Sequence, residues 1–116
     1  MGAHVVFGDT RAPAEAPSPS PRVAFVRTDV TAYGDVLGLF RAAWRRHGRV
    51  DHAIANAAVT ETGRLFATGT DDDDDDGAIE EAPPAAALDV NLRGAVFFAR
   101  VAVHYLRKSR RAARPG

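Results

Sequence analysis

Residues 23–56 read VAFVRTDVTAYGDVLGLFRAAWRRHGRVDHAIAN, and this stretch decides the fold class. It opens with an apolar run at 23–26 that ends at Thr-Asp, which is typical of a buried strand. Apolar residues then recur every three or four positions from about 32 to 47, which predicts a helix with one apolar face. A further apolar run at 50–56 predicts another strand. Strand, helix and strand in this order favour a parallel sheet of the doubly wound α/β class.

The borders of these elements also carry local signals. Thr31 is placed to act as the N-cap of the helix, and Gly48 as its C-cap. Upstream, the apolar run at 3–7 predicts one more strand that is buried on both faces. Residues 10–22 contain the stretch RAPAEAPSPSP, whose four prolines predict a Pro-rich loop instead of a helix.

The second half of the chain divides into three predicted segments. Residues 60–81 include six consecutive aspartates and few apolar side chains, which predicts a long acidic surface loop. Two consecutive prolines then open a predicted helix over 82–108, and a basic tail follows at 109–116. Because this helix has two apolar faces, it requires deep burial or a partner helix. One face holds Leu88, Leu92, Ala95, Ala99, Val103 and Leu106, and the other holds Val90, Phe97, Phe98, Val101 and Tyr105.

Composition bounds the class of protein. The 116 residues are 46% hydrophobic, enough for one core, so we expect a single domain over 1–116. Fifteen basic and fifteen acidic residues cancel, which argues against a nucleic-acid or membrane partner. There is no cysteine, no signal peptide and no apolar run of about 18 residues, so we expect a cytoplasmic protein. The four histidines are isolated, and no metal site is expected.

Four segments, in this order, resemble the short-chain dehydrogenase/reductase family. They are GAHVVFGD at 2–9, FVRTDVT at 25–31, HAIANAAV at 52–59 and DVNLRGAVFFA at 89–99. The resemblance implies a nicotinamide-dependent oxidoreductase acting on an alcohol or ketone. It implies a partial Rossmann-like, doubly wound parallel sheet, truncated so that it lacks its first strand and its C-terminal strands.

The resemblance also implies a cofactor site. Asp9 falls where an acidic residue accepts hydrogen bonds from the adenosine ribose, and its charge would repel the 2′-phosphate of NADP, which favours NAD. Asp29 and Val30 fall beside the adenine ring, although Asp29 could instead belong only to a capping turn. Asn56 and Ala57 match the stretch of the family that lines the cofactor cleft.

The segment at 89–99 carries the most specific match. Asn91 corresponds to the catalytic asparagine of the family, whose backbone carbonyl holds a water that connects the active-site lysine to solvent. Close packing would explain Gly94. Two departures lie in the preceding match, where Ala55 and Ala58 replace an asparagine and a glycine, and the second puts close backbone approach to the cofactor in doubt.

Two family motifs are absent from these residues. No stretch matches the Thr-Gly-x-x-x-Gly-x-Gly turn that binds pyrophosphate, and none matches the catalytic Tyr-x-x-x-Lys, for which Tyr105 and Lys108 have the wrong spacing. We therefore expect weak or lost NAD binding and no activity from this chain alone. The alternative is a non-catalytic module that forms a homo-oligomer through the 82–108 helix. In the family's sheet the missing strand lies between the strands at 3–7 and 51–56, which either close up or leave exposed edges.

Overall fold

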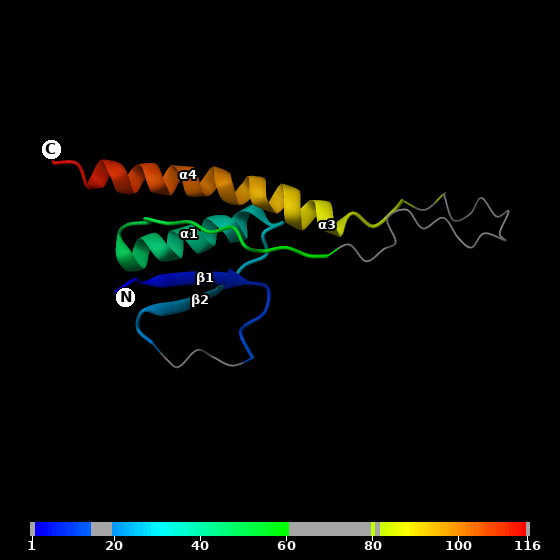
Figure 1. The fold of residues 1–116 in the computed structure, drawn as a ribbon, viewed down its shortest axis with the longest axis horizontal. Coiled ribbons are helices and arrows are strands. Elements are labelled where there is room, and N and C mark those ends of the chain that lie inside the picture. Colours follow the sequence, from blue (N-terminus) through cyan, green and yellow to red (C-terminus); the bar gives the residue numbers. More distant parts are fainter. Residues whose placement is uncertain (1, 15–19, 61–79, 81, 116) are drawn as a thin grey trace.

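The computed structural model describes residues 2–14, 20–60, 80 and 82–115. In this part of the chain the strands are β1, Val5–Asp9, and β2, Val23–Arg27, and the helices are α1, Tyr33–His47, α3, Ala86–Leu88, the π-helical turn η1, Asp89–Gly94, and α4, Ala95–Ala112. Figure 1 shows three layers, with α1 lying between the two-stranded sheet and α4. The α/β class predicted from the sequence is confirmed at this level.

The sheet is parallel, as its apolar strands predict. β1 and β2 pair in a register that runs from Val5 opposite Val23 to Asp9 opposite Arg27. The first strand therefore begins two residues later than the predicted 3–7 and includes Gly8. A Cβ atom at Gly8 would lie 2.5 Å from the Thr28 hydroxyl and 3.2 Å from Leu39 of α1, so the missing side chain lets helix and sheet approach closely.

The core lies mainly between α1 and α4. The two helices run in the same direction, side by side (Figure 1). Phe40 stacks on Tyr105 with ring centroids 5.7 Å apart, and it meets Phe98 edge-on at 5.1 Å. The buried apolar residues are Val36, Phe40, Val50, Val101, Ala102 and Tyr105.

The ends of α1 bear out one cap prediction and correct the other. Gly48 has a left-handed φ of 68°, and its N–H donates to the carbonyl one turn earlier, so it is the predicted C-cap. Thr31 is not the N-cap. The helix begins after Ala32, whose methyl side chain cannot form a cap bond, and the Thr31 hydroxyl instead donates to Asp29. Asp35, in the first turn, accepts the Asp29 N–H at 3.0 Å.

The strand predicted at 50–56 does not form, which is a correction to the expected sheet. In the described residues β1 pairs only with β2, and the backbone of 50–56 pairs with neither strand, so the strands at 3–7 and 51–56 do not close up against each other. The Val50 N–H instead donates to Ser109 Oγ at 2.7 Å, and Val59 bonds to Asn91.

Those two anchors fix the path of the segment 50–59 (the strap). Its ends meet α4 at Ser109 and η1 at Asn91, so the strap runs antiparallel to the helix (Figure 1). Nine extended steps cover about 30 Å, and the eighteen helical steps between the anchors cover about 27 Å. The strap is therefore fully extended along the helix, although Ile54 remains 79% exposed.

The helix predicted over 82–108 begins and ends later than expected. Residues 82–85 are not helical, and within them Ala82 and Pro83 each precede a proline, which disfavours the α conformation at both positions. Helix starts at Ala86 and continues to Ala112, so 109–112 of the predicted basic tail are helical. No regular structure occurs in the described parts of the Pro-rich loop, 10–14 and 20–22. The acidic loop at 60–81 lies outside the described residues, apart from 60 and 80.

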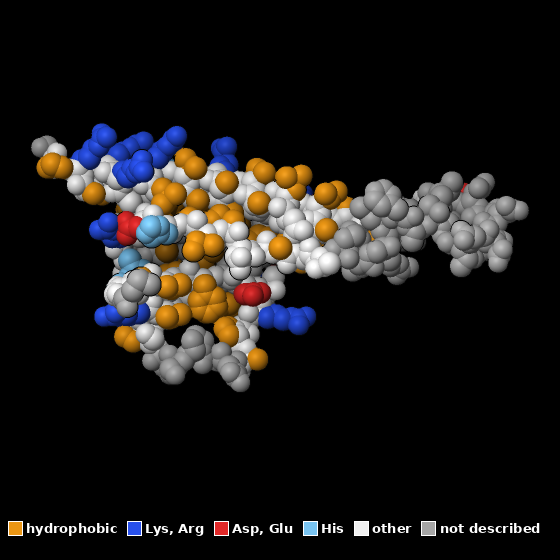
Figure 2. Space-filling view, viewed as in Figure 1, with side chains coloured by type: hydrophobic (Ala, Val, Ile, Leu, Met, Phe, Trp, Pro, Cys, Tyr) orange, Lys and Arg blue, Asp and Glu red, His pale blue; other side chains and the backbone are white. Residues whose placement is uncertain are grey.

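The two apolar faces of this helix have different surroundings. Val101 and Tyr105 are buried against α1, as one predicted face requires. On the other face Leu106 is half-buried, but an apolar stripe stays 44–62% exposed and consists of Leu88, Leu92, Val96 and Val103. Figure 2 shows hydrophobic side chains along the outer side of the helix. No helix among the described residues is both long enough and apolar enough to cross a membrane.

Candidate functional site

Three of the predicted site residues lie where β1 and β2 end. Asp9 is the last residue of β1, and its carbonyl accepts the Thr28 N–H at 2.9 Å, which continues the pairing one step beyond β2. Asp29 and Val30 follow directly. Ligands of parallel α/β sheets bind outside the carboxyl ends of the strands, so these side chains occupy the edge at which a ligand is expected.

The carboxylate of Asp9 is exposed and only loosely held. Its Oδ1 accepts from the Thr10 hydroxyl at 3.3 Å and from the Arg11 N–H at 3.4 Å, both long for hydrogen bonds. Neither contact fixes the side chain strongly. The carboxylate can therefore accept hydrogen bonds from a ligand without breaking a strong internal bond.

Asp29 is held much more firmly. Its Oδ1 accepts from the Thr31 hydroxyl at 2.7 Å and from the Thr31 N–H at 2.9 Å. These bonds, the hydroxyl bond first, lower the pKa of Asp29, so the carboxylate is ionised at neutral pH. The capping-turn alternative thus describes the local geometry. The sequence prediction made Thr31 the N-cap of the helix and paired it with Asp29 only in the capping-turn alternative, although the Asp-x-Thr spacing is the signal for such a turn.

Val30 joins the strand edge to the helix. A Cβ atom built on the buried Gly94 would lie 2.7 Å from Val30 Cγ2 and 3.1 Å from Val30 Cβ. Only glycine permits this contact without displacing Val30. The close packing predicted for Gly94 is confirmed, and one side of Val30 is covered by η1.

Asn91 links η1 to the strap. Its Oδ1 accepts the Val59 N–H at 2.8 Å, and its Nδ2 donates to the Val59 carbonyl at 2.9 Å. The amide therefore pairs with both backbone groups of one residue, as a neighbouring strand would. Sequence reasoning expected a role for the Asn91 backbone carbonyl and missed this side-chain role. A wider π-helical turn at the same place is a feature that occurs frequently at functional sites.

Asn56 and Ala57 are the least constrained of the predicted residues. Both are exposed on the strap, and neither makes a hydrogen bond to a described residue. Their position depends on Val59, which Asn91 holds. The structure thus brings Asp9, Asp29 and Val30 together at the strand ends and packs η1 against Val30. Asn56 and Ala57 are connected to the strand ends only through the strap.

Comparison with known proteins assigns the family. The chain matches no family model. It is 36% identical over 112 residues to the short-chain dehydrogenase/reductase ascJ of Acremonium egyptiacum, an alignment covering 97% of this chain and 36% of the relative. Two Penicillium rubens relatives, the short-chain dehydrogenases/reductases prx7 and prx4, are 33% and 38% identical over 83% and 92% of this chain, and 34% and 30% of their own lengths. The chain thus spans about a third of the length of these relatives. With three such relatives aligned over most of its residues, the chain belongs to the short-chain dehydrogenase/reductase family.

Proposed function

We propose that this chain forms the adenosine side of an NAD site in an oxidoreductase that interconverts an alcohol and a ketone. The observation that carries the proposal is the strand edge itself. An exposed carboxylate, Asp9, and an oriented carboxylate, Asp29, follow two adjacent parallel strands. The family of the relatives supports the same reaction class.

Each residue at this edge has a distinct proposed part. Asp9 accepts hydrogen bonds from the ribose hydroxyls, and its negative charge disfavours the 2′-phosphate of NADP. Asp29 commits Oδ1 to Thr31, so its other oxygen is the one that accepts from the adenine amine. Val30 packs against the adenine base with the side of its side chain that Gly94 does not cover. When bound, NAD supplies or accepts the hydride.

The strap forms the second wall of the proposed site. Asn91 holds Val59, and this contact keeps Asn56 and Ala57 near the end of the molecule at which η1 meets Val30. We propose that Asn91 acts here as a positioning residue in addition to the proton-relay role that its family match implies.

Binding by these residues alone is proposed to be weak. The 116 residues contain neither the glycine-rich pyrophosphate turn nor a Tyr-x-x-x-Lys motif. Backbone amides at a helix N-terminus contribute much of the pyrophosphate affinity in such folds. We therefore propose adenosine recognition without hydride transfer.

A fluorescence titration with NADH tests the proposal. The isosteric variant Asp9→Asn removes the charge at the strand edge, whereas Asp51→Asn removes an exposed charge that is paired with Arg49 elsewhere. We expect saturable NADH binding that Asp9→Asn weakens by about tenfold, the equivalent of one charge-assisted hydrogen bond. Asp51→Asn should bind as the unmodified chain does.

Two results would contradict this proposal. One is the absence of saturable binding in a chain whose circular dichroism shows it to be folded. The other is equal affinity of the Asp9→Asn and unmodified chains. NADPH provides a further comparison, because it should bind more weakly than NADH to the unmodified chain and gain relative to NADH in Asp9→Asn.

A second candidate function is self-association through the predicted 82–108 helix. The exposed apolar stripe favours it, because Leu88, Leu92, Val96 and Val103 follow one face over about four helical turns. Sedimentation equilibrium would show a dimer that Leu92→Glu dissociates, while Ile54→Glu, on the strap, leaves it intact. A folded chain that remains monomeric at high concentration excludes this function.

A further inference from the structure

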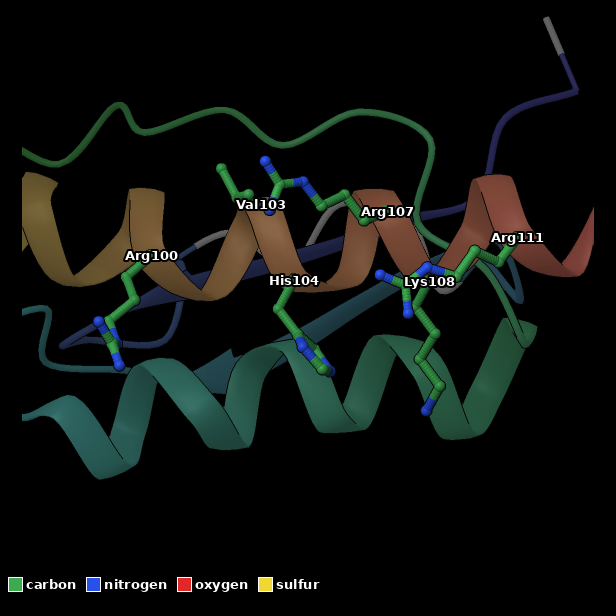
Figure 3. Close-up of a pocket in the computed structure, with 6 residues that line it drawn as sticks. All are labelled: Arg100, Val103, His104, Arg107, Lys108 and Arg111. Carbon is green, nitrogen blue, oxygen red and sulfur yellow. The ribbon is translucent and has the colours of Figure 1, made fainter.

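A basic hollow lies along the C-terminal half of α4. It is an open hollow of about 430 Å³ and is lined by Arg100, Val103, His104, Arg107, Lys108 and Arg111. Figure 3 shows His104 and Lys108 projecting from α4 toward α1, with Arg100 near one end and Arg111 near the other. Four cationic side chains and an imidazole therefore lie along one stretch of α4.

The positive charges of the hollow have no described counter-ion. Among the described residues, the ion pairs are Arg49 with Asp51 and Arg93 with Asp89, and both lie outside the hollow. The negative end of the helix dipole accounts for Arg111, which lies in the last turn, but its effect does not extend to Arg100 in the second turn of α4. An external anion would therefore relieve repulsion between like charges.

The spacing of the cations defines the shape of that anion. Arg100 and Arg111 are eleven residues apart, so the hollow extends about 16 Å along the helix axis. One phosphate cannot reach the cations at both ends of such a hollow, whereas a chain of several phosphates can contact more of the four. Lys108 is already oriented, because its ammonium lies 4.2 Å from the centroid of the Trp44 ring.

We propose that the basic hollow binds a free linear oligophosphate. A nucleic-acid strand fits less well, because single-stranded nucleic acids use exposed aromatic faces on which bases stack. Here Lys108 covers the face of Trp44, and Tyr105 is buried. His104 is therefore the one aromatic ring among the residues that line the hollow, and a single imidazole gives successive bases no continuous stacking surface.

This site is separate from the proposed adenosine site. Val30 meets the helix at Gly94, which lies six residues before Arg100, the nearest residue of the hollow, and seventeen before Arg111, so the hollow begins about 9 Å and ends about 25 Å from Gly94 along the axis. The two sites share no residue. The inference accordingly goes beyond the proposed function and does not depend on it.

Isothermal titration calorimetry of the full chain tests the inference, with inorganic tripolyphosphate and orthophosphate as probes. The variant Arg107→Gln/Arg111→Gln removes two charges that line the hollow. Its matched control, Arg110→Gln/Arg114→Gln, removes two charges that do not line it but lie at the same helix end. All of these side chains are exposed, so both variants should retain the circular dichroism spectrum of the unmodified chain.

We expect saturable binding of tripolyphosphate, at least about tenfold tighter than that of orthophosphate because more cations are engaged. The variant in the hollow should lose about tenfold, and the control less than about threefold. Three outcomes would overturn the inference. They are no saturable binding of tripolyphosphate, equal losses of affinity in the two variants, or binding of a short single-stranded oligonucleotide that tripolyphosphate does not displace. Equal losses would indicate a general counter-ion effect and not a site.

Discussion

The pairing of Asn91 with Val59 predicts a local loss of order when the amide is removed. In the variant Asn91→Ala the Val59 N–H and carbonyl lose their partners at 2.8 and 2.9 Å. Because Asn91 is exposed, water replaces the amide, and the net loss per bond falls at the lower end of the usual range. The strap should therefore detach at this end while α1 and α4 remain packed.

The magnitude follows from the two bonds. The N–H bond contributes about 0.5–1 kcal/mol, which corresponds to a factor of about 2–5 in the exchange rate of the Val59 amide. Global stability should change less, because alanine is a better helix former than asparagine by about 0.5 kcal/mol and offsets part of the loss. The effect is thus expected in local exchange more than in the free energy of unfolding.

Amide hydrogen exchange followed by NMR separates the two effects. Asn91→Ala should accelerate exchange at Val59, whereas Leu92→Ala, at the next position of η1, should not. Asn91→Asp retains an acceptor for the Val59 N–H, so exchange there should stay slow even though the Val59 carbonyl loses its donor. An unchanged Val59 rate in Asn91→Ala would refute the pairing and with it the proposed path of the strap.

Three further changes test the packing and the charges. Gly94→Ala should be about 1–3 kcal/mol less stable than Gly38→Ala in urea denaturation, because both gain helix propensity but only the first forces a clash with Val30; equal stabilities would contradict the close contact. Ser109→Ala leaves a buried N–H on the strap unpaired and should cost about 1–2 kcal/mol, and an unchanged urea midpoint would argue against that bond. The pKa of Asp29 is depressed in the folded chain, so its stabilising effect is present above its unfolded value near 3.8 and is lost as pH falls through the folded value. In the variant Thr31→Val, which removes the hydroxyl that donates to Asp29, an NMR titration should show the pKa of Asp29 rising. An unshifted midpoint would count against that hydrogen bond as the cause of the lowered pKa.

Local signals predicted much of the fold. The period of apolar residues located α1 to within a residue of its observed ends, and Gly48 marked the C-cap because few other residues adopt a left-handed φ. The strand predicted at 50–56 failed for a different reason. A strand requires a partner strand for its backbone hydrogen bonds. A run of apolar residues does not reveal the pairing, and among the described residues β1 pairs only with β2.

In the candidate site, too, local patterns predicted some features and could not predict contacts between distant positions. Asp9 and Asp29 were placed at strand ends by the local pattern, and the structure puts both at one edge. The contact of Asn91 with Val59 joins positions 32 residues apart, so no local pattern could show it. Thr31 was wrongly predicted as the N-cap because a cap and an Asx turn use the same residue types, and only the geometry distinguishes them.

The turn η1 explains how two distant segments meet at this site. In an ordinary α-helix, residues three apart lie on one face, so Asn91 and Gly94 would face the same neighbour. The wider π-helical turn separates their directions around the axis, and Asn91 reaches the strap at Val59 while Gly94 receives Val30 from the sheet. A single irregular turn thus fastens both the strap and the strand edge to the start of α4. The adenosine side of the proposed site is therefore held by contacts made outside the two-stranded sheet.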